Sequence, residues 1–64
     1  MIYQHYKGAL YKVMAFGEHT ETGEDLVIYQ DKTGKVWVRP AKMFLEKIEI
    51  DGKEVERFKF MGNF

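Results

Sequence analysis

The sequence contains no cysteine and no serine. Without cysteine there is neither a disulfide nor a thiolate metal site. With serine also missing, the two commonest nucleophiles of covalent catalysis are absent, which argues against a serine or cysteine hydrolase. Threonine, lysine and carboxylates are the nucleophiles that remain. The residues therefore favour a noncatalytic role, and no motif indicates a cofactor.

Long apolar runs are also missing. No segment approaches membrane-spanning length, and the first five residues, Met-Ile-Tyr-Gln-His, do not resemble a secretion signal. We therefore expect a soluble cytoplasmic protein with no membrane partner. The 64 residues make a single small domain, residues 1–64. A chain this short cannot enclose a large cavity, so we expect any site to be a surface groove or a shallow pocket.

The formal net charge is zero, yet the charges are segregated. Residues 18–31 carry acids and no base, and residues 32–45 carry bases and no acid. If these segments are adjacent hairpin arms, opposite charges meet across the strands. The alternative is a basic stripe beside an aromatic side chain, as in proteins that bind single-stranded nucleic acid. Overall neutrality argues against strong nonspecific binding to duplexes.

The corner at residues 31–34, Asp-Lys-Thr-Gly, predicts a hairpin closed by a type I turn and a glycine bulge. This register sets Tyr29 opposite Trp37 and Ile28 opposite Val38, with alternate side chains on opposite faces. The first face is aliphatic and carries Leu26, Ile28, Val36 and Val38. The second face carries Val27, Tyr29, Trp37 and Arg39. We predict that the aliphatic face is core and that the aromatic face is a contact surface. The alternative is that Tyr29 and Trp37 form a covered pair that only stabilises the hairpin.

Short strands are predicted over residues 10–16, 25–30, 35–39, 47–50 and 54–60. Pro40 ends the third strand and suits the start of a helical turn, which places Met43 and Phe44 over an open barrel end. Asp51-Gly52 indicates a tight turn, and residues 61–64 are expected to be frayed. The fold class is therefore predicted to be all-β. The expected architecture is a small five-stranded SH3-like barrel with one short helical turn after the third strand.

These residues resemble a family of small, mostly bacterial proteins known as domain of unknown function 1653. Four blocks carry the resemblance: Tyr3-Gln4-His5-Tyr6-Lys7-Gly8, then His19-Thr20-Glu21-Thr22, then Val27-Ile28-Tyr29, and Trp37-Val38-Arg39-Pro40 with Met43-Phe44. The similarity covers nearly the whole chain. It implies a compact bacterial domain, and it brings no activity, substrate or catalytic residue.

The two histidines are the remaining candidates for chemistry. His19 is followed closely by Glu21 and Glu24, and a histidine beside carboxylates can act as an acid or a base. The alternative is that His19 hydrogen-bonds the backbone at the start of a loop. His5, His19 and Glu21 would suit a divalent metal if they met in space. Their spacing matches no recognised metal motif, so we predict no metal site.

The leading hypothesis is a noncatalytic binding module for a protein, a peptide or a short nucleic-acid segment. Its surface is centred on Trp37, Tyr29 and Arg39. The rim of that surface is formed by His5, Tyr6 and His19. The first alternative is a histidine- and carboxylate-based enzyme or metal-dependent accessory. The second is a homo-oligomeric structural module that uses the aromatic face as its own interface.

Overall fold

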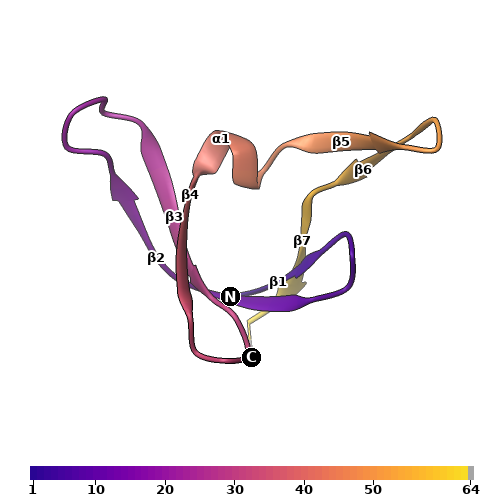
Figure 1. Ribbon diagram of the computed structural model, residues 1–64, viewed down its shortest axis with the longest axis horizontal. Coiled ribbons are helices and arrows are strands. Elements are labelled where there is room, and N and C mark those ends of the chain that lie inside the picture. Colours follow the sequence, from indigo (N-terminus) through magenta and orange to yellow (C-terminus); the bar gives the residue numbers. More distant parts are fainter. Residues whose placement is uncertain (64) are drawn as a thin grey trace.

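The computed structural model describes residues 1–63, which form two antiparallel sheets and one short helix (Figure 1). The elements are β1 (Ile2–His5), β2 (Leu10–Glu18), β3 (Asp25–Gln30), β4 (Val36–Pro40), α1 (Ala41–Phe44), β5 (Lys47–Ile50), β6 (Lys53–Glu56) and β7 (Phe58–Gly62). The larger sheet has the order β4-β3-β2-β1-β7, and β5 pairs only with β6. The all-β prediction is confirmed. The larger sheet is not closed into a barrel, so the SH3-like architecture is not confirmed.

The β3–β4 hairpin has the predicted register. The amide of Gly34 donates to the carbonyl of Asp31 at 3.0 Å, and the amide of Asp31 donates to the carbonyl of Lys35 at 2.9 Å. Gly34 has a φ of +91°, which glycine adopts without strain. Tyr29 lies opposite Trp37, and Ile28 lies opposite Val38. The turn chemistry at this corner therefore predicted the strand pairing correctly.

The prediction of which face is buried was wrong. Val27 and Tyr29 are 1% and 4% exposed, whereas Val36 and Val38 on the other face are 50% and 60% exposed. The buried core consists of Val13, Val27, Tyr29, Phe44 and Phe58. The aliphatic face, which also includes the half-buried Leu26 and Ile28, is thus the outer side of the sheet.

The reason for this inversion is aromatic packing from two distant elements. Phe44 of α1 and Phe58 of β7 stack with ring centroids 4.1 Å apart and an interplanar angle of 5°. Tyr29 meets both rings edge-on, at 5.3 Å and 5.6 Å. Large rings bury more area than valine and add favourable edge-to-face contacts. The face on which Phe44 and Phe58 pack is therefore the buried face of the sheet.

The helical turn begins where proline predicts it. Pro40, with φ −55° and ψ 135°, ends β4, and α1 follows directly. Phe44 is buried in the core and Met43 is exposed. The larger sheet is not closed, so there is no barrel end of the kind that these two residues were expected to cover. No helix in residues 1–63 is long and apolar enough to cross a membrane.

The predicted strand 54–60 is in fact two strands, β6 and β7, that separate at Arg57 and enter different sheets. β7 pairs with β1, which lies between β2 and β7 as an inner strand of the larger sheet. Met61 and Gly62 belong to β7 and are not frayed, while Phe64 lies outside the described residues. The predicted turn at Asp51-Gly52 is confirmed, since both residues have positive φ, at 50° and 78°.

Candidate functional site

Trp37 is fixed against its own hairpin turn. Its Nε1 donates to Oδ2 of Asp31 at 3.0 Å, and Nζ of Lys35 lies 4.2 Å from its ring centroid. The ring is 41% exposed. Hydrogen bonds from the Thr33 side chain first, and from Trp37 second, lower the pKa of Asp31 from 3.8 to about 2. The indole N–H and one side of the ring are therefore already engaged within the protein.

Arg39 is half-buried on the same face and leans toward the core. Its Nε donates to the hydroxyl of Tyr29 at 3.3 Å, and its Cζ lies 5.7 Å from the centroid of Phe58. Because Tyr29 is buried, it positions Arg39 and is not itself an exposed contact residue. No ion pair joins Arg39 to Asp25 or Glu46 within residues 1–63. Glu46 instead lies 3.6 Å from Nη2 of Arg57.

His5 approaches the same Phe58 ring from β1. Its ring centroid lies 5.0 Å from that of Phe58 and 4.5 Å from that of Tyr6. Nδ1 of His5 accepts a hydrogen bond from the amide of Lys7 at 3.2 Å, so the neutral ring carries its proton on Nε2. We call His5, Tyr6, Arg39, Arg57 and Phe58 the Phe58 cluster.

The Phe58 cluster is electropositive. The pKa of His5 is lowered first by burial and then by the positive charges of Lys7, Arg39 and Arg57. Burial and nearby positive charge both disfavour the protonated imidazole. His5 is therefore predominantly neutral at pH 7, and part of the lowering of its pKa comes from the three neighbouring cations.

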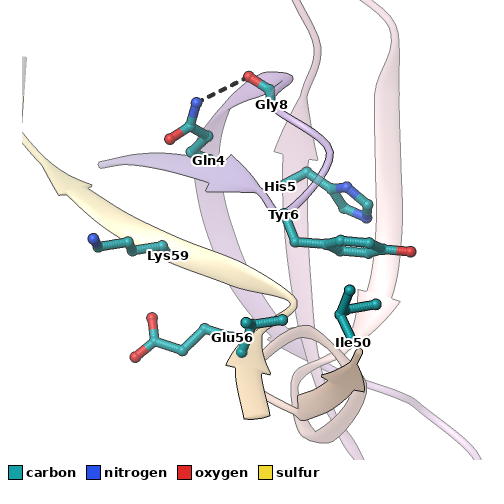
Figure 2. Close-up of a pocket in the computed structure, with 8 residues that line it drawn as sticks. Gln4, His5, Tyr6, Gly8, Ile50, Glu56 and Lys59 are labelled. Atoms are coloured by element: carbon teal, nitrogen blue, oxygen red, sulfur yellow. Dashed lines mark hydrogen bonds between the residues drawn. The ribbon is translucent and has the colours of Figure 1, made fainter. Parts of the chain in front are cut away.

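A groove of about 540 Å³ lies beside this cluster, between the β1–β2 turn and the β5–β6 hairpin (Figure 2). It is lined by Gln4, His5, Tyr6, Gly8, Ile50, Val55, Glu56 and Lys59. Nε2 of Gln4 donates to the carbonyl of Gly8 at 3.1 Å and holds the turn. Figure 2 shows the rings of His5 and Tyr6 side by side, with Ile50 next to Tyr6. Trp37, Arg39 and His19 do not line this groove.

His19 lies apart from the other predicted site residues. Its Nδ1 accepts from the amides of Glu21 and Thr22, at 3.1 Å and 3.3 Å. This confirms the alternative in which His19 hydrogen-bonds the loop backbone. Figure 1 shows the β2–β3 loop on the opposite side of the molecule from the β1–β2 turn. No group of three histidines or carboxylates that could hold a metal occurs in residues 1–63, so the arrangement of His5, His19 and Glu21 is not found.

Two members of the cluster were missed by the sequence analysis as site residues. Arg57 and Phe58 follow the point where β6 separates from β7, and no glycine or proline marks that point. Arg57 is the second of only two arginines in the chain, and that was the one available signal.

The predicted pairing between the acidic and basic arms is not seen, since the ion pairs of residues 1–63 are Lys47–Glu54 and Arg57–Glu46.

The family model described as "Protein of unknown function (DUF1653)" matches residues 1–60. The chain belongs to this family. The match covers every element except the last residues of β7, so the groove and the Phe58 cluster lie within the part of the chain shared with other DUF1653 proteins. No curated protein and no solved structure matches the chain.

Proposed function

We propose that this DUF1653 domain is a noncatalytic binding module whose ligand sits in the groove between the β1–β2 turn and the β5–β6 hairpin. The observation that carries the proposal is the paired rings of His5 and Tyr6 in the groove wall. Phe58 supports His5 from behind, so the ring pair is held in place before a ligand arrives. A rigid aromatic surface loses little conformational entropy on binding, which favours affinity.

The groove is better suited to binding than to catalysis. Nδ1 of His5 already accepts a backbone amide, and the lowered pKa of His5 leaves little imidazolium near neutral pH. The ionisable residues Glu56 and Lys59 extend to the other side of the groove from the rings (Figure 2). A general acid or base must lie within hydrogen-bond reach of the proton that it moves. The groove thus holds no paired acid and base of the kind that the enzyme hypothesis needs.

The residues predicted from the sequence take different parts in this proposal. His5 and Tyr6 contact the ligand, and Arg39 supplies positive charge from beside Phe58. Tyr29 positions Arg39 through its hydroxyl. Trp37 and His19 stabilise their own hairpins. The homo-oligomer hypothesis named the aromatic face as the interface, and the burial of Tyr29 leaves little of that face for a second copy.

The proposal predicts that one aromatic substitution removes binding. Tyr6→Ala deletes an exposed ring of the groove wall, whereas Phe16→Ala deletes a still more exposed ring on β2 that does not line the groove. We expect amide shifts at residues 4–8 and 59 when ¹⁵N-labelled protein is titrated with a pool of hexapeptides or of single-stranded hexanucleotides. Tyr6→Ala should abolish these shifts, and Phe16→Ala should retain them.

A thermal melt followed by circular dichroism checks that both variants fold. Tyr6 is exposed, so its loss removes little packing and the melting temperature should change only slightly. If neither pool shifts the amides of the groove, the proposal is wrong. The same conclusion follows if folded Tyr6→Ala binds as tightly as the unaltered protein.

A further inference from the structure

β6 has one open edge. Within residues 1–63 it pairs only with β5. Directly after β6, the amide of Arg57 donates to the carbonyl of Glu46, the residue that precedes β5, at 3.0 Å. Hydrogen-bonded and non-bonded pairs alternate along an antiparallel ladder. Counting back from this bonded pair, Glu56 and Glu54 are the non-bonded residues of β6. Their backbone amides and carbonyls therefore point away from β5, along the open edge.

The open edge of β6 faces the groove. The amide of Arg57 is bonded on the β5 side, but its carbonyl accepts the amide of Tyr6, in the β1–β2 turn, at 3.0 Å. The β1–β2 turn and β6 diverge from this bond, and Figure 1 shows β6 between β5 and that turn. Val55 and Glu56 line the groove that opens between them. The edge of a four-residue strand is about 13 Å long, which matches a short extended segment.

The charges that line the groove are of both signs. Glu56 supplies a carboxylate and Lys59 an ammonium group, across the groove from the rings of His5 and Tyr6 (Figure 2). Neither charge belongs to an ion pair within residues 1–63. A nucleic-acid strand would bring its phosphates close to the carboxylate, whereas a peptide can place a basic side chain there. The charges therefore favour a peptide over a nucleic acid.

We propose that the groove binds an extended peptide segment, which adds to the open edge of β6 as a third strand of the smaller sheet. This inference rests on the proposed function and names the ligand class. Main-chain hydrogen bonds to Glu54 and Glu56 supply affinity, as in other proteins that bind a peptide at an open sheet edge. Apolar side chains of the peptide pack toward the ring of Tyr6.

The two faces of the β5–β6 hairpin define the side-chain pattern of this peptide. Ile50 and Val55 lie on one face, whereas Glu54 and Glu56 lie on the other. A strand added beside β6 would therefore alternate apolar residues with polar ones, and a basic residue would lie opposite Glu56. Charged side chains along an open edge discourage unspecific pairing, so this complementary charge contributes to the choice of partner.

N-methylated peptides test the strand addition with the unaltered protein. The probe is a fluorescein-labelled, capped hexapeptide of sequence VTFKVT, which alternates apolar and polar residues around one lysine. In a bound strand, alternate amides face the neighbouring strand and the others face away. N-methylation of one alternate set of amides should abolish binding measured by fluorescence anisotropy. N-methylation of the other set should change affinity by less than about threefold, since it removes no hydrogen bond to β6.

Two proline variants test the same edge from the side of the protein. Glu56→Pro removes an amide that faces the groove, and Glu49→Pro removes an amide at a non-bonded position on the opposite edge of the hairpin. Both variants delete a carboxylate, and both leave the bonded pairs of β5 and β6 intact. Glu56→Pro should weaken binding of the probe by about fivefold or more, as expected for a lost hydrogen bond. Glu49 does not line the groove, so Glu49→Pro should change affinity by less than about twofold.

Glu56→Gln separates the charge from the amide. It retains the backbone amide, so it should weaken binding by only about twofold, as expected for an exposed charge pair. Equal affinities of folded Glu56→Pro and folded Glu49→Pro would contradict the role of the edge. If Glu56→Pro does not fold, the N-methylated peptides decide the question.

Three further outcomes would overturn strand addition while leaving a binding module in place. The first is that both N-methylated sets bind, or that both fail. The second is that the VTFKVT probe does not bind although the hexapeptide pool shifts the groove amides. The third is that hexanucleotides shift those amides and hexapeptides do not. Failure of both ligand pools would overturn the proposed function as well.

Discussion

At the scale of single residues, Phe58 joins the core to the candidate site. One side of its ring stacks on Phe44, and its surroundings include the edges of Tyr11 and Tyr29. The same ring contacts His5, and the guanidinium of Arg39 lies near it. Because one side chain serves both regions, the position of the cationic groups is set by the packing of the core. The site is therefore preorganised by the same contacts that stabilise the fold.

Asp31 leads to a prediction about acid stability. Its pKa in the folded protein is about 2, below the ordinary value of 3.8. Between these values the unfolded chain binds more protons than the folded protein, so the contribution of Asp31 to stability is present above pH 4 and is lost as pH falls to about 2. Asp31→Asn removes this dependence. Urea unfolding followed by Trp37 fluorescence at several pH values measures it.

The comparison of interest is the difference in unfolding free energy between the unaltered protein and Asp31→Asn. This difference should shrink as pH falls from 4 to 2. Protonation of Asp31 removes the negative charge that strengthens its hydrogen bonds from Thr33 and Trp37. A difference that stays constant over this range would contradict the assigned role of Asp31.

Among the strands, the local turn sequence predicted how β3 pairs with β4, but tertiary packing decided which face of the sheet is buried. The Asp31-to-Gly34 corner fixes the register of β3 with β4 through short-range hydrogen bonds, and the sequence shows those residues directly. Which face is buried depends on Phe44 and Phe58, which lie far along the chain. The aliphatic face looked like core because it is uniformly apolar, and no local signal reveals that aromatic rings will cover the other face.

The same distinction applies to the site. His5 and Tyr6 were predicted as the rim of a surface centred on Trp37, whereas they lie in the wall of a groove that Trp37 does not line. Arg57 was not assigned to the site, because its position results from the separation of β6 and β7, and β7 is defined by its pairing with β1. His19 is a residue type that often takes part in catalysis, yet the lone pair of its Nδ1 accepts hydrogen bonds from loop amides. A contact between segments distant in sequence accounts for the miss at Arg57, whereas His19 is engaged by amides only two and three residues away.

A buried valine and an exposed valine test which face of the larger sheet is the core. Val27→Ala removes two methyl groups from the buried core and should lower the free energy of unfolding by about 2 kcal/mol. Val38→Ala makes the same chemical change on the exposed outer side of β4 and should lower it by less than about 0.5 kcal/mol. Urea denaturation of both variants gives the comparison. Equal losses, or a larger loss for Val38→Ala, would contradict the assignment of the core.

At the scale of the whole molecule, the fold is open. Its accessible surface is 4902 Å², whereas a compact monomer of this mass exposes about 4,300 Å². The β2–β3 and β5–β6 hairpins project from the centre (Figure 1), and the dimensions are 37 × 26 × 19 Å. A small central core thus supports arms that extend into solvent. The groove lies under one of these arms, where the β5–β6 hairpin passes the β1–β2 turn.

The aromatic side of the larger sheet faces inward and thereby gathers the Phe58 cluster. The most direct measurement is the relaxation of valine methyl protons by a soluble paramagnetic agent, because the chain carries matched valines on the two sides. We expect strong relaxation of the methyls of Val36 and Val38, and protection of those of Val13 and Val27. Protected methyls on Val36 and Val38, with strongly relaxed methyls on Val27, would contradict it.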